Sequence, residues 1–178
     1  MNNVFIIQMS NILTPKEQFF ECWQKMHQIC EKEGWGDPFN YSRAKEIIIA
    51  NYLGHTVAPE LAGADGYEDK EMTKPVEYKS TIGKTISATY NGISVQSTWD
   101  EQEKYLKEQK ICKYKHHYFA RFKDGKIVEL YKMTGDKVYD FIIPKLKKQF
   151  FQEKKGKDPR LGTRIPKKFI VNNSEKLL

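Results

Sequence analysis

The segment Val76–Ser80 constrains the fold more than any other part of this sequence. Charged and uncharged residues alternate in it, and this period of two predicts a β-strand. Successive side chains of a strand point to opposite faces, so Glu77 and Lys79 share one face. Asp65 precedes Glu77 with eleven residues between them. If the residues near Asp65 form the neighbouring strand of a hairpin, two carboxylates and one ammonium converge at one place on the sheet.

These three side chains suit metal-assisted hydrolysis of a phosphodiester. Two carboxylates form a hard oxygen site for Mg²⁺ and leave coordination positions open for water and a phosphate oxygen. A lysine beside them orients or deprotonates the attacking water. The triplet alone is weakly specific, because other acid-x-lysine triplets occur, for example at 68–70, 108–110 and 124–126. The alternative interpretation of Glu77 and Lys79 is the solvated face of an edge strand.

Length and composition favour one folded domain. The chain has 178 residues, of which 39% are hydrophobic and 13% aromatic, enough to bury a core. We expect a single domain over residues 1–178, with an N-terminal helical part (1–55), a catalytic core (56–135) and a basic C-terminal part (136–178). The three cysteines show no disulfide or metal-binding spacing, and no segment resembles a signal peptide or a membrane span. These features predict a cytoplasmic protein without a membrane partner.

The net charge of +7 predicts a polyanionic partner, with nucleic acid first and an anionic membrane second. The surplus is concentrated between residues 145 and 168. Lysines there are candidates for contacts with DNA phosphates, which fix the position of a protein on DNA without reading its sequence. These candidates are Lys145, Lys147, Lys148, Lys154 and Lys155. The alternative is a solubilising surface.

Local signals predict helices interspersed with strands. Thr14 and Thr98 each begin a capping box. We expect helices over 14–33, 42–53, 98–110 and 136–151. We expect hairpins over 65–77, 85–96 and 115–133, the last two turning at Asn91-Gly92 and Asp124-Gly125, and a final edge strand over 165–171. The predicted fold class is therefore α/β, a mixed α+β sheet flanked by helices.

Apolar residues on the first two helices suggest how these helices pack. Phe19, Trp23, Met26 and Cys30 recur at helical spacing, and the sequence leaves open whether they pack in the core or form a dimer contact. In the second helix we expect the isoleucines at 47, 48 and 49 to be buried.

The adjacent pair His116 and His117 falls in an expected strand, without a matching cluster of Cys or His. Neighbouring residues of a strand face opposite ways. We therefore expect one of these histidines in the core and one at the surface, rather than two ligands of one metal ion.

The order of the elements resembles the core of the PD-(D/E)xK nucleases. That core has a strand hairpin that carries an Asp and a Glu-x-Lys, followed by a crossover helix and another strand. From about Pro59 onward, the chain resembles the PvuII-like type II restriction endonucleases of this superfamily. The resemblance rests on the segments Gly63–Asp65, Val76–Ser80, Tyr118–Tyr131 and Arg164–Ile170. The proline that usually precedes the first acid is Ala64 here, which leaves the carboxylate itself unchanged.

The resemblance implies roles for individual residues. Asp65, Glu77 and Lys79 would be catalytic. Asp65, Glu77 and the backbone carbonyl of Tyr78 would bind Mg²⁺, for which Mn²⁺ would substitute, and Lys79 would position and activate the water. Two further acids are candidates for an auxiliary role, against the simpler interpretation as surface residues: Glu46 and Glu60.

The polar segment between the catalytic strand and the helix at 98 would read the DNA sequence. Base edges in the major groove pair with the hydroxyl, amide and amino groups that this segment carries densely. The candidates are Lys84, Ser87, Thr89, Tyr90, Asn91, Gln96 and Ser97. The alternative is an ordinary polar hairpin.

The resemblance implies a Mg²⁺-dependent type II restriction endonuclease that cuts double-stranded DNA at a short palindromic or near-palindromic site. Such an enzyme would act as a homodimer, because two copies of one site cut both strands. In its host it would be accompanied by a DNA methyltransferase. The alternatives are a structure-specific or repair nuclease with the same core, such as a junction resolvase, and a non-catalytic DNA-binding module.

Overall fold

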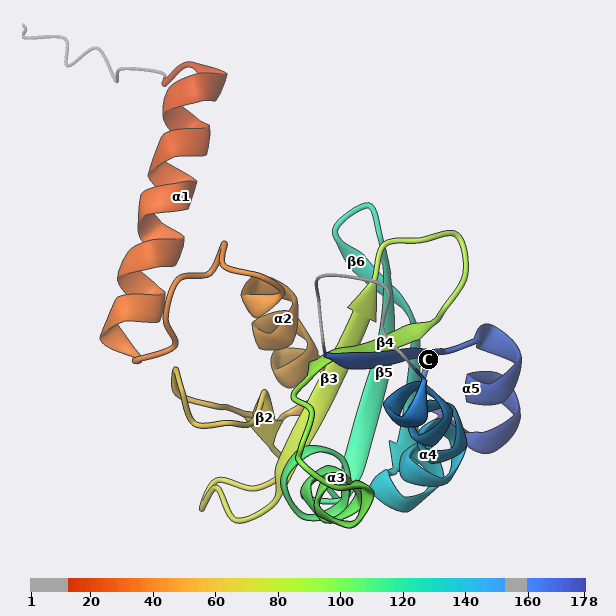
Figure 1. The fold of residues 1–178 in the computed structure, drawn as a ribbon. Helices are drawn as coiled ribbons and strands as arrows, with labels where there is room; N and C mark the ends of the chain where they lie inside the picture. The colour runs from red at the N-terminus through yellow and green to blue at the C-terminus, as the bar shows by residue number, and fades with distance from the viewer. Residues whose placement is uncertain (1–12, 153–159) are drawn as a thin grey trace, which may run out of the picture.

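The computed structural model describes residues 13–152 and 160–178. They form a mixed α+β fold in which a six-stranded sheet is the centre and a two-stranded sheet lies across it (Figure 1). Helices pack on both sides of the large sheet. The fold class predicted from the sequence is confirmed at this level.

The large sheet has the strand order β1-β2-β3-β5-β6-β8. Strand β3 (Pro75–Thr81) runs parallel to β5 (His116–Lys123), and the other neighbouring pairs are antiparallel. The connection from β3 to β5 contains α3 (Trp99–Tyr105), which continues into the π-helical segment η1 (Leu106–Lys110), so it includes the expected crossover helix. The remaining strands are β1 (Thr56–Val57), β2 (Gly66–Tyr67), β6 (Lys126–Thr134) and β8 (Glu175–Lys176).

The other helices are α1 (Pro15–Lys32), α2 (Arg43–Leu53), α4 (Gly135–Phe151) and α5 (Lys167–Asn173). Both predicted capping boxes are formed. At the start of α1, the N–H of Thr14 donates to the Glu17 carboxylate at 2.7 Å, and the Thr14 hydroxyl accepts from the Glu17 N–H. Thr98 makes the corresponding pair of bonds at the start of α3. These bonds satisfy backbone groups that have no partner inside the helix.

The expected hairpin over 85–96 is not formed, and this prediction is wrong. Residues Ala88–Ile93 are one strand, β4, which pairs antiparallel with β7 (Leu161–Ile165). Asn91-Gly92 lies inside β4, where the register shifts and Gly92 has a φ of 67°. The sequence predicted a left-handed conformation at this glycine as part of a tight turn. The conformation is present, but it is part of a bulge, because pairing with a distant strand overrides the local turn signal.

The expected edge strand over 165–171 is also wrong. Ile165 is the last residue of β7, Pro166 is the N-cap, and α5 begins at Lys167. As part of a helix, Ile170 turns onto the core and is fully buried. The burial of this face stabilises the helix over an exposed edge strand.

Two apolar clusters cover opposite faces of the large sheet. One contains Val76 and Tyr78 of β3 with Ile49 of α2, and the other joins β5 and β6 to α4 and to the β4–β7 ribbon. Because side chains alternate along β3, Glu77 and Lys79 lie on the face opposite to Tyr78, as predicted. Among the three isoleucines of α2, Ile49 is buried as predicted, Ile47 is only half-buried, and Ile48 is exposed, so the prediction for Ile48 is wrong.

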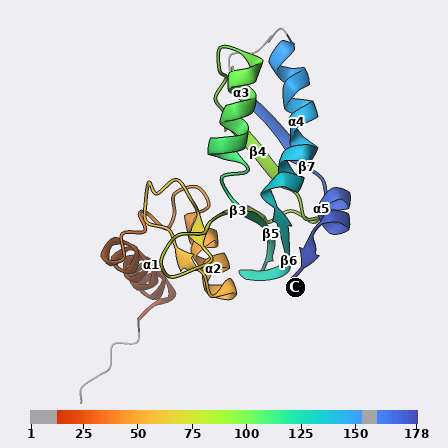
Figure 2. The ribbon, with the colours of Figure 1, turned by 90° about the horizontal axis from the view of Figure 1, so that it is seen from below.

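Helix α1 stands apart from both sheets in Figures 1 and 2. Phe19 is 72% exposed, and Trp23 and Met26 are each 40% exposed, whereas Cys30 is buried. The core interpretation is therefore wrong for the first three residues. The alternative, a contact between two copies of the chain, stays a prediction.

The histidine pair behaves as predicted. His117 is fully buried, and the half-buried His116 lies on the other face, with its Nδ1 2.6 Å from the Glu68 carboxylate. Their opposite orientations follow from strand geometry.

Candidate active site

The structure brings Asp65, Glu77 and Lys79 together at one edge of β3. The Lys79 ammonium donates to Oε1 of Glu77 two residues before it. The carboxylate of Asp65, from the residue before β2, accepts a hydrogen bond from the backbone N–H of Tyr78 at 2.7 Å. The short strand β2 pairs with β3 only as far as Val76, so Asp65 satisfies the next backbone group on that edge.

Contacts with distant parts of the chain hold the loop that carries Asp65. The Gly63 carbonyl accepts from the Tyr114 hydroxyl at 2.5 Å and from the Lys113 ammonium at 2.9 Å. The Asp65 N–H donates to the Val76 carbonyl at 3.2 Å. Gly66 follows Asp65 directly, and a Cβ atom there would overlap the Tyr78 hydroxyl. The loop thus requires glycine at position 66 for steric reasons.

Burial and neighbouring charges make Asp65 the most perturbed acid of the site. Burial is the largest cause that raises the pKa of Asp65, and the nearby carboxylates of Glu77 and Glu46 act in the same direction. Lys79 and the Tyr78 N–H oppose them, and the net result is a pKa of about 8. Two carboxylates that repel each other in a desolvated place favour a cation between them. This is the electrostatic setting that a divalent metal ion relieves.

Lys79 is held in its charged form. Burial alone would lower the pKa of Lys79, but the charges of Glu77 and Asp65 outweigh it and raise the pKa above its ordinary value. A charged ammonium donates hydrogen bonds and cannot accept a proton. In the metal-free protein Lys79 is therefore suited to orienting a water molecule rather than deprotonating it.

Glu46 of α2 belongs to the same site. Its charge acts on both Asp65 and Lys79. Its two oxygens are held by neighbours on its own helix, Oε1 by the Ser42 hydroxyl at 2.5 Å and Oε2 by Arg43 at 3.2 Å. The sequence suggested Glu46 only as one of two auxiliary acids, because its proximity depends on how α2 packs against β3.

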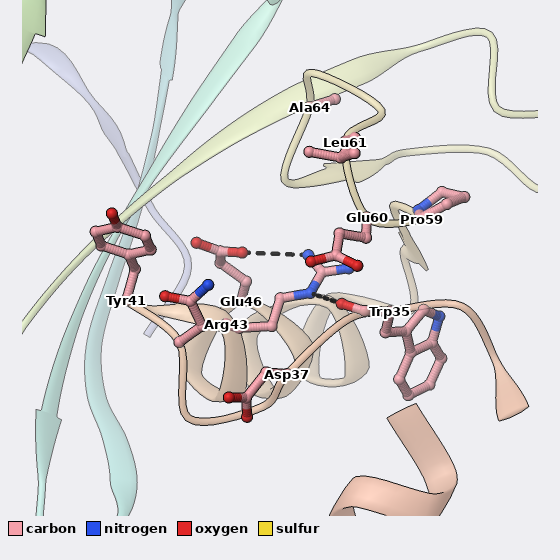
Figure 3. A pocket seen from close by; sticks show the side chains of 10 residues that line it. Trp35, Asp37, Tyr41, Arg43, Glu46, Pro59, Glu60, Leu61 and Ala64 are labelled. Carbon is pink, nitrogen blue, oxygen red and sulfur yellow. Dashed lines mark hydrogen bonds and ion pairs between the residues drawn. The ribbon is translucent and has the colours of Figure 1, made fainter. Parts of the chain in front are cut away.

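Glu60 lies in a pocket beside the site, together with Arg43 and Glu46 (Figure 3). Arg43 donates to the carbonyls of Trp35, at 2.6 Å, and of Ala58, so it ties the loop before α2 to the chain after β1. Glu60 fills the space above Gly36, where a Cβ would come within 2.7 Å of its carboxyl carbon. Glu60 therefore borders the site from the pocket side.

A second layer lies behind Lys79. The Tyr90 ring from β4 is centred 5.3 Å from the Lys79 Nζ, and the Tyr90 hydroxyl is 2.8 Å from Nδ1 of His117. Both residues are buried. The sequence suggested Tyr90 as a base-reading residue. Its ring instead lies beside Lys79, and its hydroxyl is hydrogen-bonded to His117. The sequence did not suggest His117 as a site residue. The alternation of side chains along β5 could have indicated it, because His117 pairs with Glu77 and points to the same face of the sheet.

The other candidate base-reading residues have different degrees of exposure. Lys84, Thr89, Asn91 and Ser97 are exposed, and Ser87 and Gln96 are half-buried. Ser87 accepts a hydrogen bond from Arg164 at 2.8 Å. The exposed side chains of Thr89 and Arg164 are cross-strand neighbours in the β4–β7 ribbon, so this ribbon presents polar groups to solvent.

The candidate phosphate-binding lysines of the C-terminal part lie on α4. Lys145, Lys147 and Lys148 are exposed. Lys145 also covers the Phe141 ring at 3.9 Å, and Lys147 lies 5.3 Å from the Trp99 ring. Lys154 and Lys155 lie outside the described residues.

Among residues 13–152 and 160–178, no group of three or more His, Cys, Asp or Glu side chains is arranged to hold a metal ion. Within the same ranges, no helix is both long and apolar enough to cross a membrane. All three cysteines, Cys22, Cys30 and Cys112, are free thiols.

Comparisons with known proteins do not assign the chain to a family. No protein-family model matches it. No curated protein is significantly similar to it in sequence.

Proposed function

We propose that the protein is a Mg²⁺-dependent endonuclease of the PD-(D/E)xK type, which acts in the cytoplasm as a type II restriction enzyme on double-stranded DNA. The observation that carries the proposal is the convergence of Asp65, Glu77 and Lys79 at the edge of β3. The predicted hairpin and crossover arrangement around these residues supports it, since β3 and β5 are parallel and a helix connects them. The proposed substrate, double-stranded DNA, is the one that the resemblance to PvuII-like enzymes implies.

The donor set fits Mg²⁺. Asp65 and Glu77 offer carboxylate oxygens, the ligands that Mg²⁺ prefers, and Mg²⁺ commonly uses one or two protein carboxylates and keeps several waters. The repulsion that raises the pKa of Asp65 is relieved when a cation binds. The Tyr78 carbonyl is proposed as a further ligand, because Tyr78 is held beside Asp65 by its own N–H. Bound Mg²⁺ would supply charge stabilisation of the phosphate oxygens, and Mn²⁺ would replace it.

The residues of the chain then have separate tasks. Asp65 and Glu77 hold the metal ion in place. The Lys79 ammonium donates a hydrogen bond to the attacking water and to the developing negative charge on the phosphate, which is stronger in the transition state than in the substrate. Glu46 adds negative charge beside the site, which raises the pKa values of both Asp65 and Lys79. The attacking water forms one P–O bond and loses a proton to solvent, while the P–O bond to the leaving oxygen breaks and that oxygen takes up a proton from solvent. The products are a phosphate at one end and a hydroxyl at the other.

The surface around the site supports a DNA substrate. A two-stranded β-ribbon fits the major groove of DNA, and the β4–β7 ribbon exposes Thr89, Asn91 and Arg164. The lysines lie on the exposed face of α4 and would bind phosphates. The exposed apolar face of α1 supports a homodimer, because large apolar patches rarely persist on monomers. A cognate DNA methyltransferase would protect the host genome.

A plasmid digestion tests the proposal. The protein is incubated with a sequenced supercoiled plasmid in the presence and absence of Mg²⁺, beside the variant Glu77→Gln. A set of fragments with fixed ends, formed only with Mg²⁺ and only by the wild type, is the expected result, and mapping the ends gives the recognised site. Cleavage confined to branched DNA would favour a junction resolvase. Binding of DNA without cleavage under all conditions would favour a non-catalytic DNA-binding module.

A further inference from the structure

Tyr90 lies between the surface that faces solvent and the interior of the candidate active site. Along β4, the side chains of Thr89 and Asn91 are exposed, whereas Tyr90 is only 5% exposed. Its ring lies 5.3 Å from the Lys79 Nζ, within the distance at which an aromatic face attracts an ammonium. Lys79 therefore has two anchors, the carboxylate of Glu77 and the face of Tyr90.

A buried chain of hydrogen bonds fixes the orientation of the Tyr90 ring. Nε2 of His117 lies 3.0 Å from the Ile111 carbonyl, which can only accept, so Nε2 carries the proton. Nδ1 is then the acceptor, and the Tyr90 hydroxyl donates to it at 2.8 Å. His117 is fully buried, and burial lowers its pKa to about 4, which keeps it neutral and the chain of donors unchanged near neutral pH.

This series of hydrogen bonds connects two parts of the fold that are distant from each other in the sequence. Tyr90 belongs to the β4–β7 ribbon, which Figure 2 shows between α3 and α4. His117 belongs to β5 and is the register partner of Glu77 on β3. The bulge that follows Tyr90, with Gly92 at a φ of 67°, gives the ribbon a local place to change its backbone without breaking the pairing of the flanking residues.

We propose that Tyr90 is a specificity-determining positioning residue, which couples base contacts on the exposed face of β4 to the position of the Lys79 ammonium. The inference rests on the proposed function. A correct base pair held by Thr89 or Asn91 sets the backbone of β4, and the Tyr90 side chain, which points the opposite way, places its ring where Lys79 meets the attacking water. A wrong base pair shifts the ring, and the bond to His117 no longer holds it in the productive orientation.

Two conservative variants test this coupling. Tyr90→Phe keeps the ring and removes the hydroxyl, whereas His117→Leu has a similar volume and removes the acceptor for Tyr90 together with the donor to the Ile111 carbonyl. Single-turnover cleavage is measured on a DNA duplex that carries the site mapped by plasmid digestion, and on duplexes with one base pair changed. Binding of the same duplexes is measured in EDTA, and folding is checked by circular dichroism and thermal unfolding. Tyr139→Phe is the matched control, because the Tyr139 hydroxyl bonds to Glu103 at 3.0 Å away from the site.

The expected result is a loss of discrimination without a loss of binding. Tyr90→Phe and His117→Leu should each lower the ratio of cleavage rates on the mapped and altered sites by about tenfold, the size of one buried hydrogen bond. The double variant should lose no more than either single variant, because both break the same bond. Affinity for the mapped site in EDTA should remain within about twofold of wild type.

Four outcomes would overturn the inference. Wild-type discrimination in Tyr90→Phe would show that the hydroxyl is not used. Equal losses in Tyr139→Phe, or losses in binding that match those in cleavage, would show a general structural effect. If the wild type itself cuts no DNA with Mg²⁺, the proposed function fails first, and the coupling falls with it.

Discussion

The carboxylate of Asp65 accepts a 2.7 Å hydrogen bond from the backbone N–H of Tyr78, at the point on β3 where pairing with β2 has ended. A side chain thus takes the place of a neighbouring strand. The bond orients Asp65 along the edge of β3, beside Glu77 and Lys79. The position of Asp65 therefore depends on a short strand, and a longer β2 would remove both the free N–H and the space for the carboxylate.

Asp65→Asn, Glu77→Gln and Lys79→Ala should each abolish Mg²⁺-dependent DNA cleavage. The first two remove a metal ligand, and the third removes the group that orients the water, for which a loss of about 10² to 10⁴ in rate is typical. Plasmid nicking and linearisation under single-turnover conditions measure the effect. Glu108→Gln, in an exposed acid-x-lysine triplet, is the control and should cut like the wild type. Near-wild-type cleavage by any of the three variants would contradict the assignment.

The stability of the metal-free protein should fall as the pH rises from about 6.5 to 8. The raised pKa of Asp65, about 8 against an ordinary 3.8, means that the folded state binds one more proton between these values, so its stability decreases as the pH rises through this range. His117 acts in the opposite direction at lower pH, because its pKa is about 4 in the folded state and 6.5 ordinarily, and its contribution is lost as the pH falls through that range. The two effects oppose each other between about pH 4 and 6.5, and Asp65 acts alone above it.

Urea denaturation at pH 4 to 9, in EDTA, measures this dependence. Asp65→Asn should remove the decrease in unfolding free energy between pH 6.5 and 8. Added Mg²⁺ should stabilise the wild type more at pH 8 than at pH 5, because a metal ion binds the ionised carboxylate. An unchanged slope in Asp65→Asn would show that another group causes the decrease.

Gly66→Ala should destabilise the fold and displace Asp65. A Cβ at this position would overlap the Tyr78 hydroxyl, which is itself held by His55 at 2.9 Å. Overpacking of this kind costs about 1–3 kcal/mol. Thermal unfolding measures the loss, and DNA cleavage should fall as well. Gly83→Ala is the control, since a Cβ there comes within 3.2 Å of the Thr81 side-chain oxygen and no closer than 3.8 Å to the Thr85 carbonyl oxygen. Equal stability of the two variants would refute the steric argument.

Trp23→Asp should prevent self-association in the absence of DNA. The exposed face of α1, with Phe19 and Met26 beside Trp23, is expected to pair with the same face of a second copy. Light scattering across micromolar concentrations measures the molar mass. Ile82→Asp is the control, because Ile82 is 76% exposed, follows β3 directly and does not belong to α1, so this change should leave the mass unchanged. A wild type that remains monomeric over this range would contradict the predicted contact, and two copies would then come together only on DNA.

Neutralising the lysines of α4 should weaken DNA binding mainly at low salt. Each phosphate contact contributes about 0.9 to the slope of log affinity against log salt, so replacing Lys145, Lys147 and Lys148 by Gln should reduce that slope by up to about 2.7. Fluorescence anisotropy between 50 and 200 mM salt measures it, and the mapped cleavage site should be unchanged. The charge-matched control replaces Lys16, Lys25 and Lys32 of α1. Equal slopes for all three proteins would show that the α4 lysines only solubilise the surface.

The sequence by itself determined the features that depend on neighbouring residues. The capping boxes at Thr14 and Thr98 place two helix starts, because the bonds they use reach only three residues along the chain. The hairpin at Asp124-Gly125 forms because both residues adopt positive φ angles, 50° and 74°, inside an alternating pattern. The shared face of Glu77 and Lys79 follows from the period of a strand. None of these features needs a partner from elsewhere in the chain.

Only the tertiary structure decided which segments meet. Asn91-Gly92 has a turn signal, but β4 pairs with β7 some seventy residues away, and the burial gained there outweighs the local preference for a turn. The sequence predicts Tyr90 as a polar residue of a surface hairpin, but the pairing of β4 with β7 places its ring beside the Lys79 ammonium. Glu46 joins the site only because α2 packs against β3, and Phe19 of α1 remains exposed although its helical spacing also suits a core position. Burial depends on contacts between distant segments, and the spacing of residues within one segment does not specify them.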